Sequence, residues 1–186
     1  MPGRFAARVA RTLQQIWLRR GLVAWTLLPL SLVYGTLVRL RRAAFERNLV
    51  PTHRLAVPVI VIGNLIVGGA GKTPVVLALA ALLRRHGYTP GIIARGYGGQ
   101  AATPVLEVEP GTPATACGDE PKLLRLRSGA PVVVGRNRPA AGRALLRAHP
   151  SVDLVLSDDG LQHLALARDV QVIVFDARGA GNGWLF

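Results

Sequence analysis

The stretch Gly68-Gly69-Ala70-Gly71-Lys72-Thr73 decides the fold because of the segments on either side of it. It follows a short apolar run, Val57–Ile62 (VPVIVI), and precedes Pro74–His86, in which apolar residues recur at helical spacing. Glycines allow main-chain N–H groups to close around an anion, and the following helix adds the positive end of its dipole. This order of strand, loop and helix predicts a phosphate-binding loop.

The polar groups of this loop have distinct predicted tasks. The ammonium of Lys72 would reach the terminal phosphates of a nucleotide, and the hydroxyl of Thr73 would bind Mg²⁺. The usual pattern has a glycine where this chain has Ile66, so the match is imperfect. Lys72 is, however, one of only two lysines among 23 basic residues, which indicates a need for a compact ammonium. The alternative is a glycine-rich turn with a solvated lysine. The expected nucleotide contacts are Gly68, Gly69, Ala70, Gly71, Lys72, Thr73 and Pro74.

After His53 the chain alternates short apolar runs with helical patterns. Strands separated by helices pair in parallel and are joined by right-handed crossovers. We therefore expect a P-loop NTPase-like α/β fold, with a mostly parallel sheet and helices on both faces. The stretch Gly96–Thr115, rich in Gly, Pro and Ala, is expected to be a long loop or an irregular hairpin. Further strands are predicted at Gly91–Ala94, Val132–Val134, Leu154–Leu156 and Val170–Phe175, and a further helix at Pro139–Ala148.

A nucleotide site of this kind needs a carboxylate for Mg²⁺ at the end of a neighbouring strand. Ser157-Asp158-Asp159-Gly160 follows an apolar run and meets that requirement, although a polar turn after a strand is the simpler interpretation. We expect Thr73, Asp158 and Asp159 to form the metal site. Asp158 is the expected direct or water-mediated ligand, and Asp159 would orient the metal or a reacting group.

Other charged groups follow strands or open helices. Asp119, in Gly118-Asp119-Glu120-Pro121, would serve as a helix N-cap or as a catalytic carboxylate, and spacing alone favours the N-cap. Ligands bind at the carboxyl ends of strands in open α/β sheets. Arginines at such ends would meet anionic groups of substrate or nucleotide, whereas a solvated basic face is the alternative. The expected substrate contacts are Arg95, Tyr97, Arg136 and Arg138.

Composition limits the broad class of protein. The chain has 186 residues, of which 50% are hydrophobic, and its mean hydropathy of +0.32 excludes a disordered tail protein. A single cysteine excludes a disulfide scaffold and a cysteine-based zinc site. The formal net charge is +13, but residues 1–54 contain ten arginines and one acid and so carry most of it. This concentration beside the most apolar stretch argues against nucleic-acid binding.

That apolar stretch, residues 21–38, is an uncharged run of 18 residues with arginines on both flanks. As a helix it would reach roughly 27 Å, just short of a hydrocarbon core of about 30 Å, and Pro29 and Gly35 weaken the helix further. Upstream, apolar residues recur at helical spacing between arginines, which is typical of a basic amphipathic helix on anionic lipid. We expect residues 1–50 to be a membrane-associated helical segment, spanning the bilayer or embedded in one leaflet. A buried core helix is the alternative.

The motifs together resemble the tetraacyldisaccharide 4′-kinase family, the lipid A kinases of Gram-negative bacteria. A Gly-Gly-x-Gly-Lys-Thr loop alone is shared by many proteins, whereas the Asp-Asp-Gly-Leu-Gln-His string and the ordered set are far more specific. The matching segments are Val61–Asn64, Val67–Pro74, Arg95–Gly99, Gly118–Pro121, Val134–Arg138, Asp158–His163, Phe175–Ala177 and Gly181–Gly183.

The resemblance implies an ATP- and Mg²⁺-dependent kinase that phosphorylates the 4′-hydroxyl of a lipid A disaccharide precursor, a tetraacyldisaccharide 1-phosphate. It places that reaction at the cytoplasmic face of the inner membrane and implies no obligate protein partner. The family's proposed general base maps to Asp119, so the implied catalytic groups are Asp119, Lys72 and Asp159, while Gln162 and His163 would support the metal loop.

Family members are longer, with a second α/β domain, so we expect residues 51–186 to be the nucleotide-binding domain of a larger enzyme. On that expectation, the 186-residue chain alone would bind nucleotide weakly and phosphorylate poorly. Two other functions remain open. One is a membrane-associated P-loop ATPase or GTPase switch, although Val67 replaces the lysine that such proteins often carry there. The other is a non-catalytic membrane-binding module with a degenerate nucleotide site.

Overall fold

The computed structural model describes residues 25–26, 28–47, 49–64, 71–99 and 103–177. The chain divides into two compact units, Val50–Val174 and Met1–Leu49 with Phe175–Phe186. The predicted amphipathic helix near the N-terminus lies outside the described residues, as do Gly68, Gly69 and Ala70.

The larger unit is built on a six-stranded sheet with the order β3-β4-β2-β5-β1-β6. All neighbouring strands are parallel except β3, which runs antiparallel to β4 at one edge. Strands β1 and β5 lie side by side, with Ile62 in register with Asp158. Their carboxyl ends therefore open onto the same edge of the sheet. The strands are β1 (Val59–Gly63), β2 (Pro90–Ala94), β3 (Val105–Glu107), β4 (Val132–Gly135), β5 (Leu154–Asp158) and β6 (Val170–Ile173).

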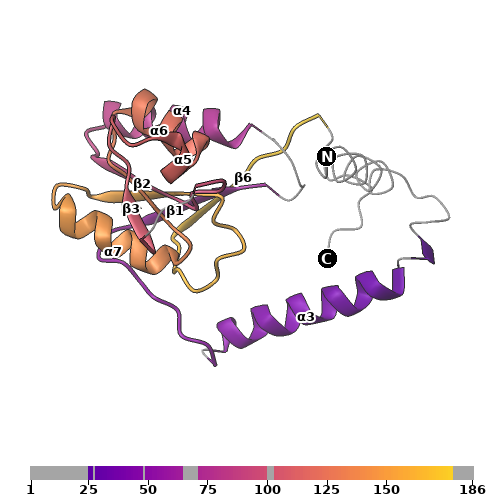
Figure 1. Ribbon diagram of the computed structural model, residues 1–186. Helices are drawn as coiled ribbons and strands as arrows, with labels where there is room; N and C mark the ends of the chain where they lie inside the picture. Colours follow the sequence, from indigo (N-terminus) through magenta and orange to yellow (C-terminus); the bar gives the residue numbers. More distant parts are fainter. Residues whose placement is uncertain (1–24, 27, 48, 65–70, 100–102, 178–186) are drawn as a thin grey trace, which may run out of the picture. The chain divides into compact units, whose positions relative to one another are not determined.

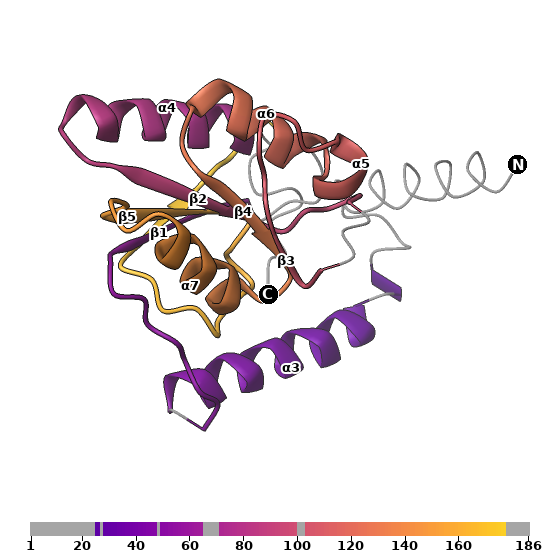
Figure 2. The ribbon, with the colours of Figure 1, turned by 60° about the vertical axis from the view of Figure 1, so that its left-hand side comes forward.

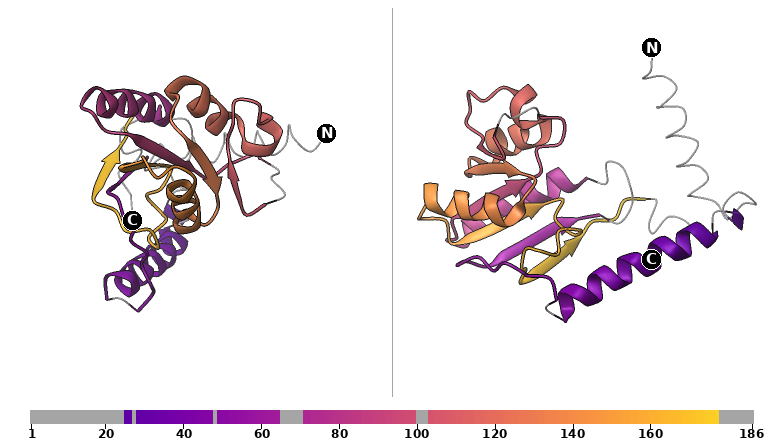
Figure 3. Two further views of the ribbon diagram at one scale, coloured as in Figure 1. Left: turned by 90° about the vertical axis from the view of Figure 1, so that its left-hand side faces the viewer. Right: turned by 60° about the horizontal axis from the view of Figure 1, so that its bottom comes forward.

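Helices cover both faces of this sheet. Helices α4, α5 and α6 lie over one face and α7 lies over the other (Figure 1, Figure 2). The end-on view in Figure 3 (left) shows the sheet between α7 and the pair formed by α4 and α6. The helices of this unit are α4 (Lys72–Arg85), α5 (Ala114–Cys117), α6 (Asp119–Ser128) and α7 (Arg138–Ala148).

The alternation of side chains along the strands produces two cores. On the α4 and α6 side, Ile62, Ile92 and Leu156 pack with Val76 and Leu124. On the α7 side, the strand residues one position away pack instead; they include Val61, Ile93, Val133 and Val155, together with Ala141 and Leu145 of the helix. Because the central strands are buried on both faces, they read as continuous apolar runs in the sequence.

The predicted fold class is confirmed, and most predicted element boundaries differ from the observed ones by one or two residues. The exception is Gly96–Thr115, which was expected to be a loop or an irregular hairpin. It contains the edge strand β3 and the start of α5. Strand β3 has only three residues, none of them fully buried, and so lacks both length and an alternating pattern.

The smaller unit contains α3 (Leu28–Glu46), which continues through the positions that were expected to weaken it. Pro29 lies in the first turn, where the missing N–H of proline leaves no hydrogen bond unmade. Gly35 is the buried residue of this helix. Among the described residues, no helix combines the length and the apolarity that crossing a membrane requires.

Candidate functional site

Of the four small residues of the predicted phosphate loop, the structure describes Gly71, which directly precedes α4. Its φ is 76°, a left-handed conformation that glycine adopts without steric cost. Because Gly71 has no side chain, it offers no side-chain acceptor to the first N–H groups of α4. Thr73 and Pro74 lie in the first helical turn. Main-chain N–H groups at the start of a helix and the positive end of its dipole suit an anion.

The ammonium of Lys72 is held between two strand ends. Its Nζ donates a hydrogen bond of 2.8 Å to Oδ1 of Asn64, the residue directly after β1. The same nitrogen lies 3.1 Å from Oδ1 of Asp159, directly after β5. The Lys72 side chain is only 16% exposed, whereas that of Asp159 is 52% exposed. The positive charge thus lies at the junction of β1, β5 and α4.

The last residue of β5, Asp158, is buried and incompletely bonded. Its side chain is 3% exposed, and Oδ1 has no hydrogen-bond partner among the described residues. The pKa of Asp158 is raised to about 6: burial is the largest cause, the charges of Glu120 and Asp159 act in the same direction, and those of Lys72 and Arg138 oppose it. An orphaned carboxylate oxygen beside a lysine is suited to a cation that binds together with phosphate.

Asp159 occupies a tight turn. Its φ is 54°, the only positive value among the described residues other than glycine, and aspartate tolerates this region better than most residues. Gly160 follows, and a Cβ there would lie 2.5 Å from the Oγ of Ser157. The close packing of this Asp-Gly turn directs the Asp159 carboxylate toward Lys72.

Arg138 lies beneath the same turn and is wholly buried. Its guanidinium donates to the carbonyl oxygens of Gly135 at 3.0 Å and Asp158 at 2.7 Å. Burial lowers the pKa of Arg138 to about 10, so it remains charged at neutral pH. The prediction that Arg138 contacts substrate is therefore corrected, because the side chain is buried and its Nη1 and Nη2 donate to main-chain carbonyls, Nη2 to those of the turn that carries both aspartates, while Nε has no partner among the described residues.

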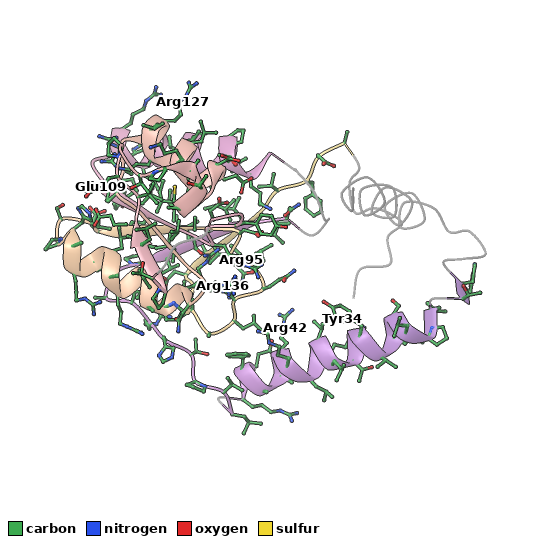
Figure 4. The ribbon with its side chains drawn as sticks, viewed as in Figure 1. Tyr34, Arg42, Arg95, Glu109, Arg127 and Arg136 are labelled. Atoms are coloured by element: carbon green, nitrogen blue, oxygen red, sulfur yellow. The ribbon has the colours of Figure 1, made fainter. Side chains whose placement is uncertain are left out.

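The other predicted substrate residues remain accessible. Arg95 directly follows β2 and Arg136 directly follows β4, and these strands are neighbours, so both arginines leave the sheet at its carboxyl edge (Figure 4). Both are exposed. Tyr97 is 83% exposed, two residues beyond Arg95.

Asp119 opens α6 as its first helical residue and is exposed. The N-cap position belongs to Gly118, so the expectation of an Asp119 N-cap is wrong. Gly118 has φ of 91°, and a Cβ there would lie 2.5 Å from the carbonyl oxygen of Tyr97. This close approach brings the start of α6 against the segment that follows β2. The Asp119 carboxylate is exposed in the first turn of α6 and does not occupy the N-cap position.

Two residues of this site were not predicted as functional. Asn64 binds Lys72, and Glu120 is close enough to Asp158 to raise its pKa. Asn64 ends the segment Val61–Asn64 and Glu120 is adjacent to Asp119, and this adjacency is the one signal that the sequence offers for either residue. Within the described ranges, no three His, Cys, Asp or Glu side chains form a self-sufficient metal centre. Mg²⁺ in nucleotide sites uses one or two carboxylates with phosphate oxygens, which Thr73, Asp158 and Asp159 would fit.

A strand, a glycine loop and a helix beginning at lysine, with an aspartate ending the adjacent parallel strand, define a P-loop kinase-type α/β protein. The chain belongs to the tetraacyldisaccharide 4′-kinase family, because the family model described as Tetraacyldisaccharide-1-P 4'-kinase matches residues 23–186.

Individual relatives agree with this assignment. A tetraacyldisaccharide 4'-kinase of Methylibium petroleiphilum is 58% identical over 173 residues, which are 93% of this chain and 48% of the relative. That of Acidovorax sp. (strain JS42) is 54% identical and covers 99% of this chain and 54% of the relative. The crystal structure of LpxK from Aquifex aeolicus, titled an "apo" form in complex with ATP, matches with a TM-score of 0.73 and 32% identity, over 82% of this chain and 49% of that one. The chain thus spans about half the length of the curated relatives it matches.

Proposed function

We propose that this chain supplies the nucleotide site of a kinase that transfers the γ-phosphoryl group of ATP to the 4′-hydroxyl of a tetraacyldisaccharide 1-phosphate. The observation that carries the proposal is Lys72, held between Asn64 and Asp159 beside the orphaned carboxylate of Asp158. The names of the relatives and the ATP in the Aquifex aeolicus LpxK structure support the same conclusion.

The proposed chemistry divides among residues at one sheet edge. Lys72 neutralises negative charge on the β- and γ-phosphates, and the first main-chain N–H groups of α4 donate hydrogen bonds to them. Asp119 accepts the proton of the sugar hydroxyl as its oxygen bonds to the γ-phosphorus and the bond to the ADP oxygen breaks. Arg95 and Arg136 are exposed at the same edge and suit the anionic groups of the acceptor, with Tyr97 beside them.

Thr73, Asp158 and Asp159 are the residues that would hold Mg²⁺. The fit rests on the unpartnered Oδ1 of Asp158 and on the exposed carboxylate of Asp159. When bound, Mg²⁺ would neutralise charge on the phosphates. Arg138 contributes indirectly, because its guanidinium holds the carbonyl of Asp158 and thereby the direction of the turn.

We further propose that the protein acts at the cytoplasmic face of the inner membrane, with its N-terminal segment attached to lipid. The support is the pattern of α3, whose exposed apolar side chains include Leu30, Tyr34 and Leu37. Arg39, Arg41 and Arg42 are also exposed near its C-terminal end. Apolar side chains with arginines at the interface are typical of helices that bind anionic bilayers.

The test uses the complete gene product with ATP labelled in the γ-phosphate and a tetraacyldisaccharide 1-phosphate in mixed micelles. The proposal requires label in the lipid, dependent on Mg²⁺, and no labelled lipid with an acceptor already phosphorylated at the 4′ position. Robust ATP hydrolysis without labelled lipid would identify an ATPase switch instead. Absence of both binding and turnover would indicate a non-catalytic module.

A further inference from the structure

The connection between β5 and β6 carries the two aspartates at its beginning and is anchored firmly at its end. The N–H of His53 donates to the carbonyl of Ala165 at 2.8 Å, and the N–H of Ala167 donates back to His53 at 2.9 Å. Oδ2 of Asp169 accepts a hydrogen bond from the N–H of Val59, and the N–H of Asp169 donates to the carbonyl oxygen of Val59. The far end of this connection is therefore fastened to the chain that leads into β1.

Arg168 lies in this anchored end and reaches back toward the aspartates. Its Nη2 donates to the carbonyl of His163 at 2.7 Å, and its Nη1 donates to that of Leu161 at 3.0 Å and approaches that of Gly160 at 3.5 Å. One guanidinium thus donates to three of the four carbonyl oxygens that follow Asp159, those of Gly160, Leu161 and His163.

These contacts require arginine. A guanidinium presents several donors in a fixed planar fork, whereas a lysine ammonium is a compact point charge that satisfies fewer carbonyls at defined angles. Arg168 is partly buried, and burial lowers its pKa. All of its hydrogen bonds in the described part of the chain go to main-chain carbonyls, so its charge serves the loop conformation.

The two ends of the turn are held by different guanidinium groups. Arg138 binds the carbonyls of Asp158 at 2.7 Å and Asp159 at 3.4 Å from the α7 side, and Arg168 binds the carbonyls that follow Asp159. Between them, Asp159 keeps its positive φ and lies beside Lys72. Without Arg168, Arg138 and the N–H of Gly160, which donates to the carbonyl of Ile62, would still hold the beginning of the turn, but the carbonyls of Leu161 and His163 would lose their charged donor.

We propose that Arg168 is a positioning residue for the phosphoryl-transfer site, acting through the carbonyls of residues 160–163 to hold Asp159 in its metal-binding direction. The proposal rests on the function proposed above. Groups that orient the ligands of a metal site contribute about 10- to 100-fold to metal affinity or activity. Arg168 therefore has a measurable role although it contacts neither nucleotide nor metal.

The first test needs neither metal nor nucleotide. In the metal-free protein, hydrogen exchange is measured at the amides of His163 and Leu166, which donate to carbonyls within the loop. Arg168→Gln should speed their exchange about tenfold or more. The matched control is Arg54→Gln, because Arg54 binds the adjacent Asp169 and touches none of the three carbonyls. The control should leave the exchange of both amides unchanged.

The second test is a Mg²⁺ titration at fixed ATP, followed by calorimetry. Arg168→Gln should raise the half-saturating Mg²⁺ concentration about tenfold, Arg168→Lys should give an intermediate value, and Arg54→Gln should match the wild type. In the complete gene product, Arg168→Gln and Arg168→Lys should lower kcat and leave the KM for the lipid acceptor unchanged, and Arg54→Gln should leave both unchanged. If Arg168→Gln does not fold, Arg168→Lys decides, and an unaltered Mg²⁺ dependence in that variant overturns the proposal.

The outcomes separate the two proposals. Equal effects of Arg168→Gln and Arg54→Gln on Mg²⁺ affinity would overturn the positioning role and leave the kinase proposal standing. A wild-type protein that binds no Mg²⁺ and ATP would overturn both.

Discussion

Lys72 and Asp159 form an ion pair of 3.1 Å although one opens α4 and the other follows β5. Since more than half of the Asp159 side chain is exposed, the pair contributes little to stability, on the order of 1 kcal/mol or less. A phosphate can therefore replace Asp159 as the partner of Lys72 at small cost. In this arrangement, Asp159 holds the ammonium in place until the nucleotide arrives.

Replacement of Lys72 separates nucleotide binding from stability. Lys72→Ala should weaken ATP binding by more than about tenfold, because a full positive charge near the phosphates is lost, and should change the free energy of unfolding little. The control is Lys122→Ala, since Lys122 donates to the carbonyls of Pro110 and Thr112, both at 2.6 Å. That variant should lose about 1–2 kcal/mol of stability and keep its ATP affinity, as measured by calorimetry and denaturation. Unchanged ATP binding in Lys72→Ala would favour the non-catalytic module.

Neutralising Asp158 should stabilise the metal-free protein while it abolishes Mg²⁺ dependence. The pKa of this carboxyl is raised from 3.8 to about 6, so the folded protein retains a proton that the unfolded chain releases. The contribution of Asp158 to stability is therefore fully present at low pH and is lost as the pH rises through about 6. Asp158→Asn should gain about 3 kcal/mol over the wild type at about pH 8 and almost nothing at about pH 3, below the pKa of the unfolded chain. Urea denaturation at both values measures this, and a gain that is independent of pH contradicts the assignment.

The same titration controls metal binding. A carboxylate must lose its proton to bind Mg²⁺, so Mg²⁺ affinity in the presence of ATP should fall steeply below about pH 6. Calorimetry in buffers of different ionisation enthalpy should detect proton release on binding at about pH 6 and little at about pH 8. Proton release that does not depend on pH would show that Asp158 is not a ligand.

Gly118 offers a test of the geometry at the start of α6. Gly118→Ala should cost about 2–4 kcal/mol, because φ is 91° and the added Cβ would meet the Tyr97 carbonyl at 2.5 Å. Gly111→Ala is the matched control, since a Cβ there meets nothing within 4 Å. Chemical denaturation of both variants measures the difference. Equal stabilities would show that the approach of α6 to Tyr97 is not needed for the fold.

Asp119 should affect turnover far more than ATP affinity. Because Gly118 holds the N-cap position, Asp119→Ala removes a proton acceptor and little helix stability. We expect kcat in the complete gene product to fall by about 10²–10⁴-fold, with Asp119→Asn equally impaired. ATP titration of the same variants provides the comparison, and a parallel loss of affinity and turnover would point to a role in helix structure.

Much of the fold could be predicted because the central strands are buried on both faces and therefore appear as apolar runs. Val59–Gly63 and the helix at Lys72 were recognisable from these runs and from the glycine loop between them. Strand β3 was missed because three half-exposed residues in an antiparallel edge strand carry no such pattern.

The candidate site could be predicted only where a residue's place in the chain implies its place in space. Strand ends place Asp158 and Arg95 at one edge of the sheet, as the structure shows. The same argument misplaced Arg138, since a position after a strand does not reveal that the side chain turns inward. The partnership of Asn64 with Lys72 depends on the rotamers of two side chains and on a loop path that local sequence does not determine.

The pairing of β1 with β5 also governs when the site can exist during synthesis. Strand β1 is synthesised early. Its neighbour β5 (Leu154–Asp158), which carries Asp158 at its end, leaves the ribosome only after β2, β3 and β4. Contacts between such distant segments form slowly, because a long loop must close before they stabilise anything. A nascent chain that exposes the glycine loop therefore lacks both aspartates, and the candidate site can form only after the central sheet has closed.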